Sequence, residues 1–229
     1  MKNQKEKDVL SREALMEELG DVHFSKSPFT PLLSTAFETS DEDKKVLVAK
    51  HFRAIMETLG LDLSDDSLNG TPERVAKMMV SEIFHGLNPA NEPAISVFEN
   101  NFGYHDILLE KNIDVFSTCE HHFLPIVGRA HVAYIPGDKV IGLSKLNRVV
   151  EHFSKRPQVQ ERLNRQIVER LKEVLETEDV ACIIEADHYC VKSRGVGHTH
   201  SATTTMEYSG VFKSQDKRKE LMDLIQLKG

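Results

Sequence analysis

The chain has 229 residues, of which 40% are hydrophobic and 28% charged, an ordinary composition for a globular protein. Its 29 basic and 36 acidic residues give a net charge of −7, which argues against non-specific nucleic-acid binding but leaves room for a local basic pocket. No apolar run is long enough to cross a bilayer, and the first twenty residues lack the apolar centre of a signal peptide. We therefore expect a cytoplasmic protein.

The N-terminal part of the chain is expected to be an extension followed by helices. Residues 1–39 are polar or rich in Ser, Thr and Pro, and we expect a partly disordered extension with a short helix over 11–19. A helical region is expected over 40–105. Ser40 begins a capping pattern for its first helix, and Pro72 stands in the first turn of its second.

Strand and helix patterns alternate in the C-terminal half. Residues 106–215 are expected to form one core of a strand pair, a helix pair and a second strand pair, followed by a polar tail over 216–229. The expected elements are a strand over 107–118, a hairpin over 128–143 with its turn at 136–138, helices over 144–155 and from 157, a strand from 179, and a last strand over 204–212.

Two short segments carry residues that bind metals in proteins. In Cys119-Glu120-His121-His122, the first and last side chains would face opposite sides of an ideal strand, so a metal site requires a bulge or a turn there. In His188-Tyr189-Cys190, the outer residues share one side of a strand. Each segment alone is also compatible with a structural cysteine beside histidines that have no chemical role.

Together the segments offer a Cys–His–Cys set. Cys119, His122 and Cys190 would leave a fourth position on a zinc ion for water, as catalytic zinc sites do. His121 and His188 would then be available for proton transfer. The third cysteine, Cys182, lies among apolar residues and is expected to be a core residue. Three cysteines are too few for a disulfide framework.

Basic side chains recur near these segments, although each can equally be part of a solvated helix face. Ser144 stands at an expected helix N-terminus, where backbone N–H groups favour anions. Glu161, in the first turn of the next helix, either complements the helix dipole or accepts two hydrogen bonds from a guanine-like base. The basic residues that could form a phosphate pocket include Arg74, Lys77, Lys145, Arg148 and Arg194.

The motifs combine into a resemblance to a known family. STCEHHF, VIGLSKLNRVVEHFSKRPQVQERL, HYCVKSRGV and SATTTMEYSGVF occur in that order and closely resemble GTP cyclohydrolase I of the bacterial zinc-dependent type. TPERVAKM and LDLSDDSL also resemble that family, so the similarity runs from about residue 40 to about residue 215. The motifs are long and ordered, and the resemblance favours the zinc site over the structural alternative.

The resemblance implies a fold and an assembly. The family has the α+β tunnelling fold, in which a four-stranded antiparallel sheet carries two helices on one face and is preceded by an N-terminal helical region. Its subunits form a toroidal homodecamer, a dimer of pentamers, with active sites between subunits.

The resemblance also implies a role for each candidate residue. Cys119, His122 and Cys190 match the Zn²⁺ ligands, and His121, His188 and Ser144 match catalytic positions. The expected substrate-binding residues are Glu161 with Gln160 for guanine, and Lys145, Arg148, Arg194, Arg74 and Lys77 for the triphosphate, Lys77 being given by a neighbouring subunit. The implied reaction hydrolyses GTP at guanine C8, releases formate, and closes the rearranged ribose into 7,8-dihydroneopterin triphosphate, the first pterin towards tetrahydrofolate.

Two alternatives come from different classes. A nitrile reductase of the same fold uses a cysteine nucleophile and NADPH, but it lacks a Cys–His–Cys zinc set. A non-catalytic oligomeric scaffold would use zinc structurally, and such a site normally closes with a fourth protein ligand.

The His188→Ala variant separates the enzyme from the scaffold. In the enzyme, His188 transfers protons without holding zinc, so the variant is expected to keep zinc and assembly and to lose activity. Loss of zinc together with folding would instead favour a structural site that includes His188. Zinc content, oligomer mass and turnover of GTP are the measurements.

Overall fold

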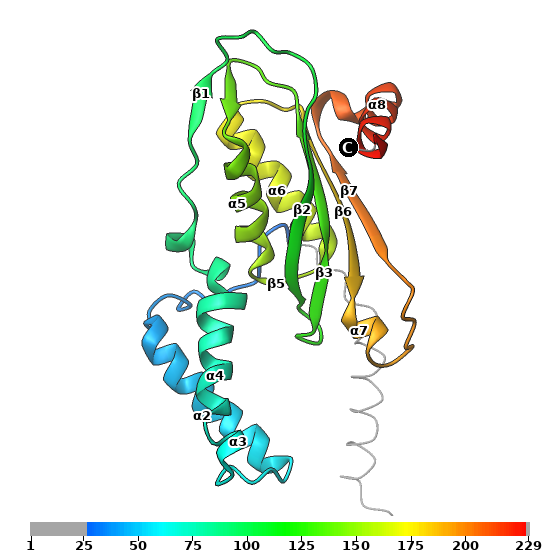
Figure 1. Cartoon of the computed structure of the whole chain (residues 1–229). Helices are drawn as coiled ribbons and strands as arrows, with labels where there is room; N and C mark the ends of the chain where they lie inside the picture. The colour runs from blue at the N-terminus through cyan, green and yellow to red at the C-terminus, as the bar shows by residue number, and fades with distance from the viewer. Residues whose placement is uncertain (1–26, 228–229) are drawn as a thin grey trace, which may run out of the picture.

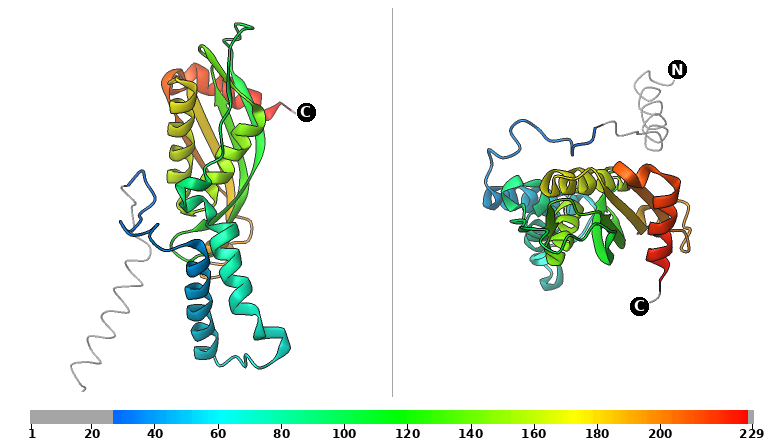
Figure 2. Two further views of the ribbon diagram at one scale, coloured as in Figure 1. Left: turned by 90° about the vertical axis from the view of Figure 1, so that its left-hand side faces the viewer. Right: turned by 90° about the horizontal axis from the view of Figure 1, so that it is seen from above.

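The computed structural model describes residues 27–227 of the chain. The short helix expected over 11–19 lies outside the described residues. The described chain forms a largely antiparallel sheet with helices on its faces and a helical region beyond one end of the sheet (Figures 1 and 2), which confirms the expected α+β class. Among residues 27–227, no helix combines the length and the apolar character needed to cross a membrane.

The helical region begins with α2 (Asp41–Thr58), whose N-cap is Ser40. The Ser40 hydroxyl accepts a hydrogen bond from the backbone N–H of Asp43 at 3.1 Å, as the capping pattern predicts. Helices α2 and α4 pack side by side (Figure 1). The remaining elements of this region are α3 (Asp66–Asn69), α4 (Thr71–Met78), the π-helical turn η1 (Met79–Ile83), and the 3₁₀ turns η2 (His85–Leu87) and η3 (Pro89–Asn91).

The main sheet has the strand order β5-β2-β3-β6-β7. Strands β2, β3, β6 and β7 are antiparallel neighbours, whereas β5 runs parallel to the last residues of β2. The strands are β2 (Leu108–Cys119), β3 (Pro125–Tyr134), β5 (Pro157–Gln158), β6 (Val180–His188) and β7 (Thr203–Tyr208).

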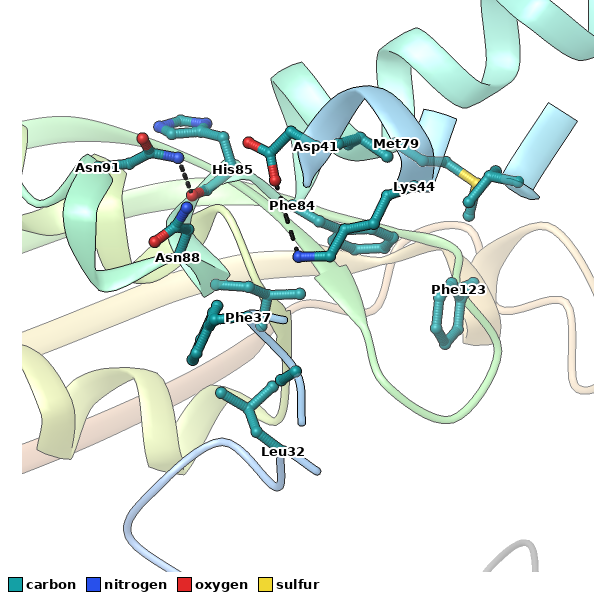
Figure 3. Close-up of a pocket in the computed structure, with 14 residues that line it drawn as sticks. Leu32, Phe37, Asp41, Lys44, Met79, Phe84, His85, Asn88, Asn91 and Phe123 are labelled. Atoms are coloured by element: carbon teal, nitrogen blue, oxygen red, sulfur yellow. Dashed lines mark hydrogen bonds and ion pairs between the residues drawn. The ribbon is translucent and has the colours of Figure 1, made fainter. Parts of the chain in front are cut away.

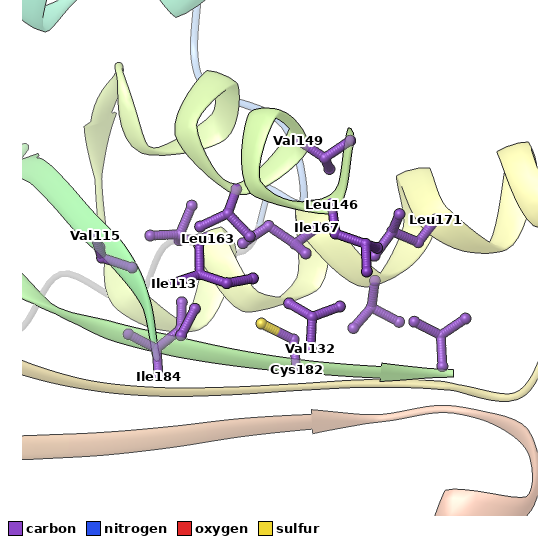
Figure 4. Close-up of a cluster of buried hydrophobic side chains, with 14 of the residues drawn as sticks. Ile113, Val115, Val132, Leu146, Val149, Leu163, Ile167, Leu171, Cys182 and Ile184 are labelled. Carbon is purple, nitrogen blue, oxygen red and sulfur yellow. The ribbon is translucent and has the colours of Figure 1, made fainter. Parts of the chain in front are cut away.

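Helices α5 (Leu143–Ser154) and α6 (Gln160–Leu175) cover one face of this sheet (Figure 2). Figure 4 shows Leu163 and Ile167 of α6 facing Cys182 and Ile184 of β6 across the core. Alternate residues of β6 lie in the two clusters on opposite faces of the sheet, as the strand pattern predicts, and Cys182 is 0% exposed, which confirms that it is a core residue.

A further helix, α8 (Gln215–Gln226), packs on the opposite face of the sheet. Its Leu221 is 0% exposed and lies with Phe212, from the 3₁₀ turn η4 (Gly210–Lys213), against Ala181 and Ile183. The structure therefore differs from the polar tail expected over 216–229. The signal that we gave too little weight is the helical spacing of Leu221, Leu224 and Ile225 within a mostly charged segment.

The hairpin expected over 128–143 is wrong. Strand β4 (Lys139–Ile141) pairs with β1 (Val97–Glu99), and both neighbours of β3 are the longer strands β2 and β6. The backbone N–H of Ile141 donates to Tyr134 Oη at 3.2 Å, which fixes the start of α5 near the end of β3. A three-residue strand cannot bury as much apolar surface on β3 as β2 and β6 do, so it pairs elsewhere.

Two expectations near residues 157 and 190 also need correction. Pro157 does not open a helix, because Pro157–Gln158 forms β5 beside Thr118 and Cys119, and α6 begins at Gln160. Strand β6 ends at His188, and Cys190 lies on the short helix α7 (Tyr189–Lys192) instead of on the strand. Both changes place backbone turns next to the candidate metal residues.

The helical region meets the core at a buried histidine of α5. His152 is 3% exposed, and its Nε2 accepts a hydrogen bond from the Arg156 guanidinium at 2.7 Å. Burial, helped by the charge of Arg156 and opposed by that of Glu92, lowers the pKa of His152 to about 4. His152 is therefore neutral in the folded protein at pH values where an unfolded chain would protonate it.

This histidine makes stability fall as the solution becomes acidic. Between pH 6.5 and about 4 the unfolded chain binds a proton that the folded chain does not, so the free energy of unfolding decreases as pH falls through that window. We expect about 1 kcal/mol of this loss by pH 5.5. Urea denaturation at pH 7.5 and 5.5 should show a smaller loss in His152→Gln than in the wild type; equal losses would contradict the assignment.

Candidate functional site

Three side chains converge where strands β2 and β6 end. Cys119, His122 and Cys190 each place one ligand atom within 4.8 Å of the others. Within residues 27–227, this is the one group of three or more Cys, His, Asp or Glu side chains close enough to share a metal ion. The structure thus brings together the donor set expected from the sequence.

A tight turn after β2 creates half of this cluster. The backbone N–H of Cys119 donates to Leu124 O at 2.8 Å, and that of Phe123 donates back to Cys119 O at 2.8 Å. Phe123 adopts a positive φ of 55°, which is uncommon outside glycine. The turn brings His122 to the same side as Cys119, and it is the departure from ideal strand geometry that a metal site required.

The change from β6 to α7 creates the other half. Cys190 lies on the first turn after the strand, and it is partly buried. Burial and the neighbouring Cys119 raise the pKa of Cys190 to about 11. Two thiols and one imidazole are ligands that suit zinc, and a bound cation favours the thiolate forms. Three protein donors also leave a coordination position for water.

His188 stands beside the cluster in a fixed orientation. The amide group of Gln160 donates to Ile184 O and to Thr203 O, both at 3.0 Å, so its oxygen faces His188 Nε2 at 2.7 Å. In the neutral ring, Nε2 therefore carries the proton and Nδ1 keeps its lone pair. Burial lowers the pKa of His188, and the charges of Glu161 and Asp187 oppose this shift.

Gln160 itself is only 2% exposed. Both of its amide hydrogens are donated to backbone carbonyls and its oxygen contacts His188, so its side chain does not offer these hydrogens to a substrate. The expectation that Gln160 binds guanine beside Glu161 therefore stays a prediction, to which its side-chain hydrogens would not contribute. The neighbouring Glu161 is exposed, so its carboxylate is accessible.

Other expected residues surround the same cluster. His121 Nδ1 lies 3.8 Å from Cys119 Sγ, and the charge of Arg194 acts on Cys190. The turn also contains a residue that the sequence reasoning missed. Glu120 forms two hydrogen bonds with Arg162, at 2.6 and 3.0 Å. The only sequence signal for Glu120 was its position between the candidate ligands.

Ser144, Lys145 and Arg148 lie elsewhere. They belong to the first half of α5, which starts near Tyr134, and Tyr134 pairs with the first residue of β2. Cys119 is the last residue of β2, a strand of 12 residues that spans roughly 36 Å at 3.3 Å per residue. One chain therefore does not bring these residues to the Cys–His–Cys cluster.

Arg74 and Lys77 are also outside the cluster in this chain. Both are on α4, in the helical region beyond the end of the sheet (Figure 1). The Arg74 guanidinium donates to Thr71 Oγ1 at 2.9 Å and to Ser67 O at 3.4 Å, so it is held within its own region.

A cavity of about 350 Å³ lies between Phe123 of the turn and the helical region (Figure 3). Phe123 lies at its edge and packs edge-to-face on Phe84, with ring centroids 5.4 Å apart. Lys44 at the rim is paired with Asp41 at 3.7 Å. This cavity is mostly lined by apolar side chains and is a poor match for a triphosphate, which requires several unpaired cationic groups. The candidate site is therefore the cluster of cysteine and histidine side chains.

The antiparallel sheet with its helix pair is the arrangement of the tunnelling fold, and beside it Cys119, His122 and Cys190 could hold a metal ion. The model of the family "GTP cyclohydrolase I" matches residues 48–226. The chain belongs to this family. It is 54% identical to GTP cyclohydrolase 1 of Flavobacterium johnsoniae, over 96% of this chain and 98% of the relative. It is 51% identical to GTP cyclohydrolase 1 of Aeromonas hydrophila, over 93% and 96% of the two chains.

A third relative, GTP cyclohydrolase 1 of Erwinia tasmaniensis, is 53% identical over 84% of this chain and 88% of its own. These findings confirm the family resemblance drawn from the motifs. They favour the cyclohydrolase over the nitrile reductase and the non-catalytic scaffold. Members of this family are generally metal-dependent, and the donor set described above fits that property.

The donor set makes a prediction about metal content. His122→Ala and Cys190→Ser each remove one of three converging donors, so the metal bound per chain after dialysis should fall to a small fraction of the wild-type value. Cys182→Ala is the matched control, because this cysteine is fully buried in the core and lies outside the donor set. Atomic absorption is the measurement. Wild-type metal content in Cys190→Ser would contradict the site.

Proposed function

We propose that this protein is a zinc-dependent GTP cyclohydrolase I that converts GTP to 7,8-dihydroneopterin triphosphate with release of formate, at the start of tetrahydrofolate synthesis in the cytoplasm. The observation that carries the proposal is the meeting of Cys119, His122 and Cys190 beside His188 in a chain of this family. When bound there, Zn²⁺ supplies Lewis-acid activation of water for attack on guanine C8.

The residues around the cluster transfer protons and bind the substrate. Gln160 bonds to Nε2 of His188, so Nδ1 of His188 is the atom that accepts and returns a proton at the purine ring. His121, on the turn, is the second proton-transfer group. Glu161 is exposed and its carboxylate can accept two hydrogen bonds from the N–H groups of guanine. Arg194 binds the triphosphate from the side of Cys190.

The residues that lie far from the cluster lead to an oligomer. We propose that Ser144, Lys145 and Arg148 serve the site of an adjacent subunit, and that Arg74 and Lys77 reach a site from another subunit. Strands β2 and β7 support this arrangement, because among residues 27–227 no strand pairs with the outer edge of β7 and only the short β5 pairs with the outer edge of β2. Unpaired edges favour pairing between copies. In the expected homodecamer, neighbouring subunits would supply both groups of distant residues.

The scaffold alternative is weaker for a geometric reason. A structural zinc site closes with four protein ligands, and among the described residues only three donors converge here.

The activity test uses zinc-loaded protein and GTP. Formate and, after oxidation, fluorescent neopterin triphosphate are expected in equal amounts. If folded, zinc-loaded protein forms neither formate nor the pterin, the proposal is overturned. Formate without the pterin would contradict the proposed roles of Ser144 and the phosphate-binding residues, because ring opening would then occur without ring closure.

Subunit mixing tests where the site is built. His188→Ala and Lys145→Ala should each be inactive alone, because they damage different halves of every site. When the two variants assemble together, sites that combine the intact halves return, and random mixing predicts about a quarter of wild-type activity. Inactive mixed oligomers would contradict a site shared between subunits. Separately assembled variants combined without exchange are the control.

A further inference from the structure

A buried arginine of α6 is attached to the metal-binding turn. The side chain of Arg162 is 2% exposed, and that of Glu120 is 21% exposed. Arg162 Nη1 donates to Glu120 Oε2 at 2.6 Å, and Nη2 donates to Oε1 at 3.0 Å. This two-bond geometry fixes both the position and the plane of the carboxylate, which a single bond would not do.

The pair acts on the turn from a second direction. The backbone N–H of Glu120 donates to Gln158 O at 3.0 Å, so its main chain is tied to β5 and its side chain to α6. Glu120 lies directly between Cys119 and the two histidines. The bonds to Arg162 and Gln158 add to the two backbone hydrogen bonds that close the turn between Cys119 and Leu124.

We propose that Arg162 is a positioning residue that acts through Glu120 to hold the turn in its metal-binding conformation and so raises metal affinity. This inference rests on the proposed function for the identity of the metal. Burying a guanidinium is costly, and replacing a buried ion pair by apolar side chains of similar volume is often neutral or stabilising. A charged pair at this place is explained if the turn must be held in one geometry. Residues that orient metal ligands in this way typically contribute ten- to a hundredfold to affinity, about the range we expect here.

A second ion pair on the same helix provides a matched control. Arg170 Nε donates to Glu92 Oε1 at 2.6 Å, and both side chains are partly exposed. This pair links α6 to the segment after η3, and neither of its residues belongs to the metal-binding turn. Arg170→Lys therefore makes the same chemical change as Arg162→Lys without touching the site.

The experiment measures the Zn²⁺ dissociation constant of the full-length oligomer by competition with a chromogenic chelator. We expect Arg162→Lys and Glu120→Gln each to weaken Zn²⁺ binding by about ten- to a hundredfold. The double variant should bind Zn²⁺ no more weakly than the worse single variant, because both substitutions disrupt the same ion pair. Arg170→Lys should stay within about twofold of the wild type. The absorption bands of Co²⁺-loaded protein should change in the two site variants only, which a general loss of stability would not cause.

The outcomes separate the two proposals. If the wild type binds Zn²⁺ and the Arg162→Lys and Glu120→Gln variants bind it equally well, the positioning role is wrong while the proposed function stands. Single variants whose losses add fully in the double variant would also overturn it. If the wild type binds no Zn²⁺, the proposed function fails first. Should Arg162→Lys not fold, Glu120→Gln, at a more exposed position, decides the question.

Discussion

The buried polar side chains of α6 hold this structure together at the point where function is expected. Asn164 donates to Cys182 O at 2.8 Å and accepts from the Thr205 hydroxyl at 2.7 Å, and Gln160 reaches the same two strands one turn earlier. Because buried polar groups are costly unless they are paired, these bonds fix how far along the sheet α6 can sit. Arg162, between them, then lies opposite Glu120.

Sheet register completes the arrangement. Antiparallel pairing places Thr118 opposite Pro125, and Ile126 opposite His188, so the end of β2 and the end of β6 meet across the start of β3. The cluster therefore unites segments that are distant in sequence without any long excursion of the chain. The first turn of α6 contacts both segments, one through Gln160 and His188 and the other through Arg162 and Glu120.

Much of this could be predicted from the sequence where periodicity and family motifs coincide. Alternation along β6 and the cap at Ser40 were read correctly, and the motifs identified the donor set. The pairing partners of the strands were not predicted correctly. The turn residues at Pro136 favour a local hairpin, whereas β3 pairs with the longer strands β2 and β6. The burial of Gln160 and Arg162 escaped prediction because both are usually exposed types, and only the packing of α6 against the sheet reveals their partners.

The raised pKa of Cys190 has a consequence for the durability of the protein. The sulfur atoms of Cys119 and Cys190 lie within 4.8 Å of each other, which is close enough for oxidation to link them after a small movement. The thiolate is the form that oxidants attack, and a pKa of about 11 keeps nearly all of Cys190 protonated at neutral pH. The same burial that disfavours the Cys190 thiolate therefore slows its oxidation wherever the site holds no metal.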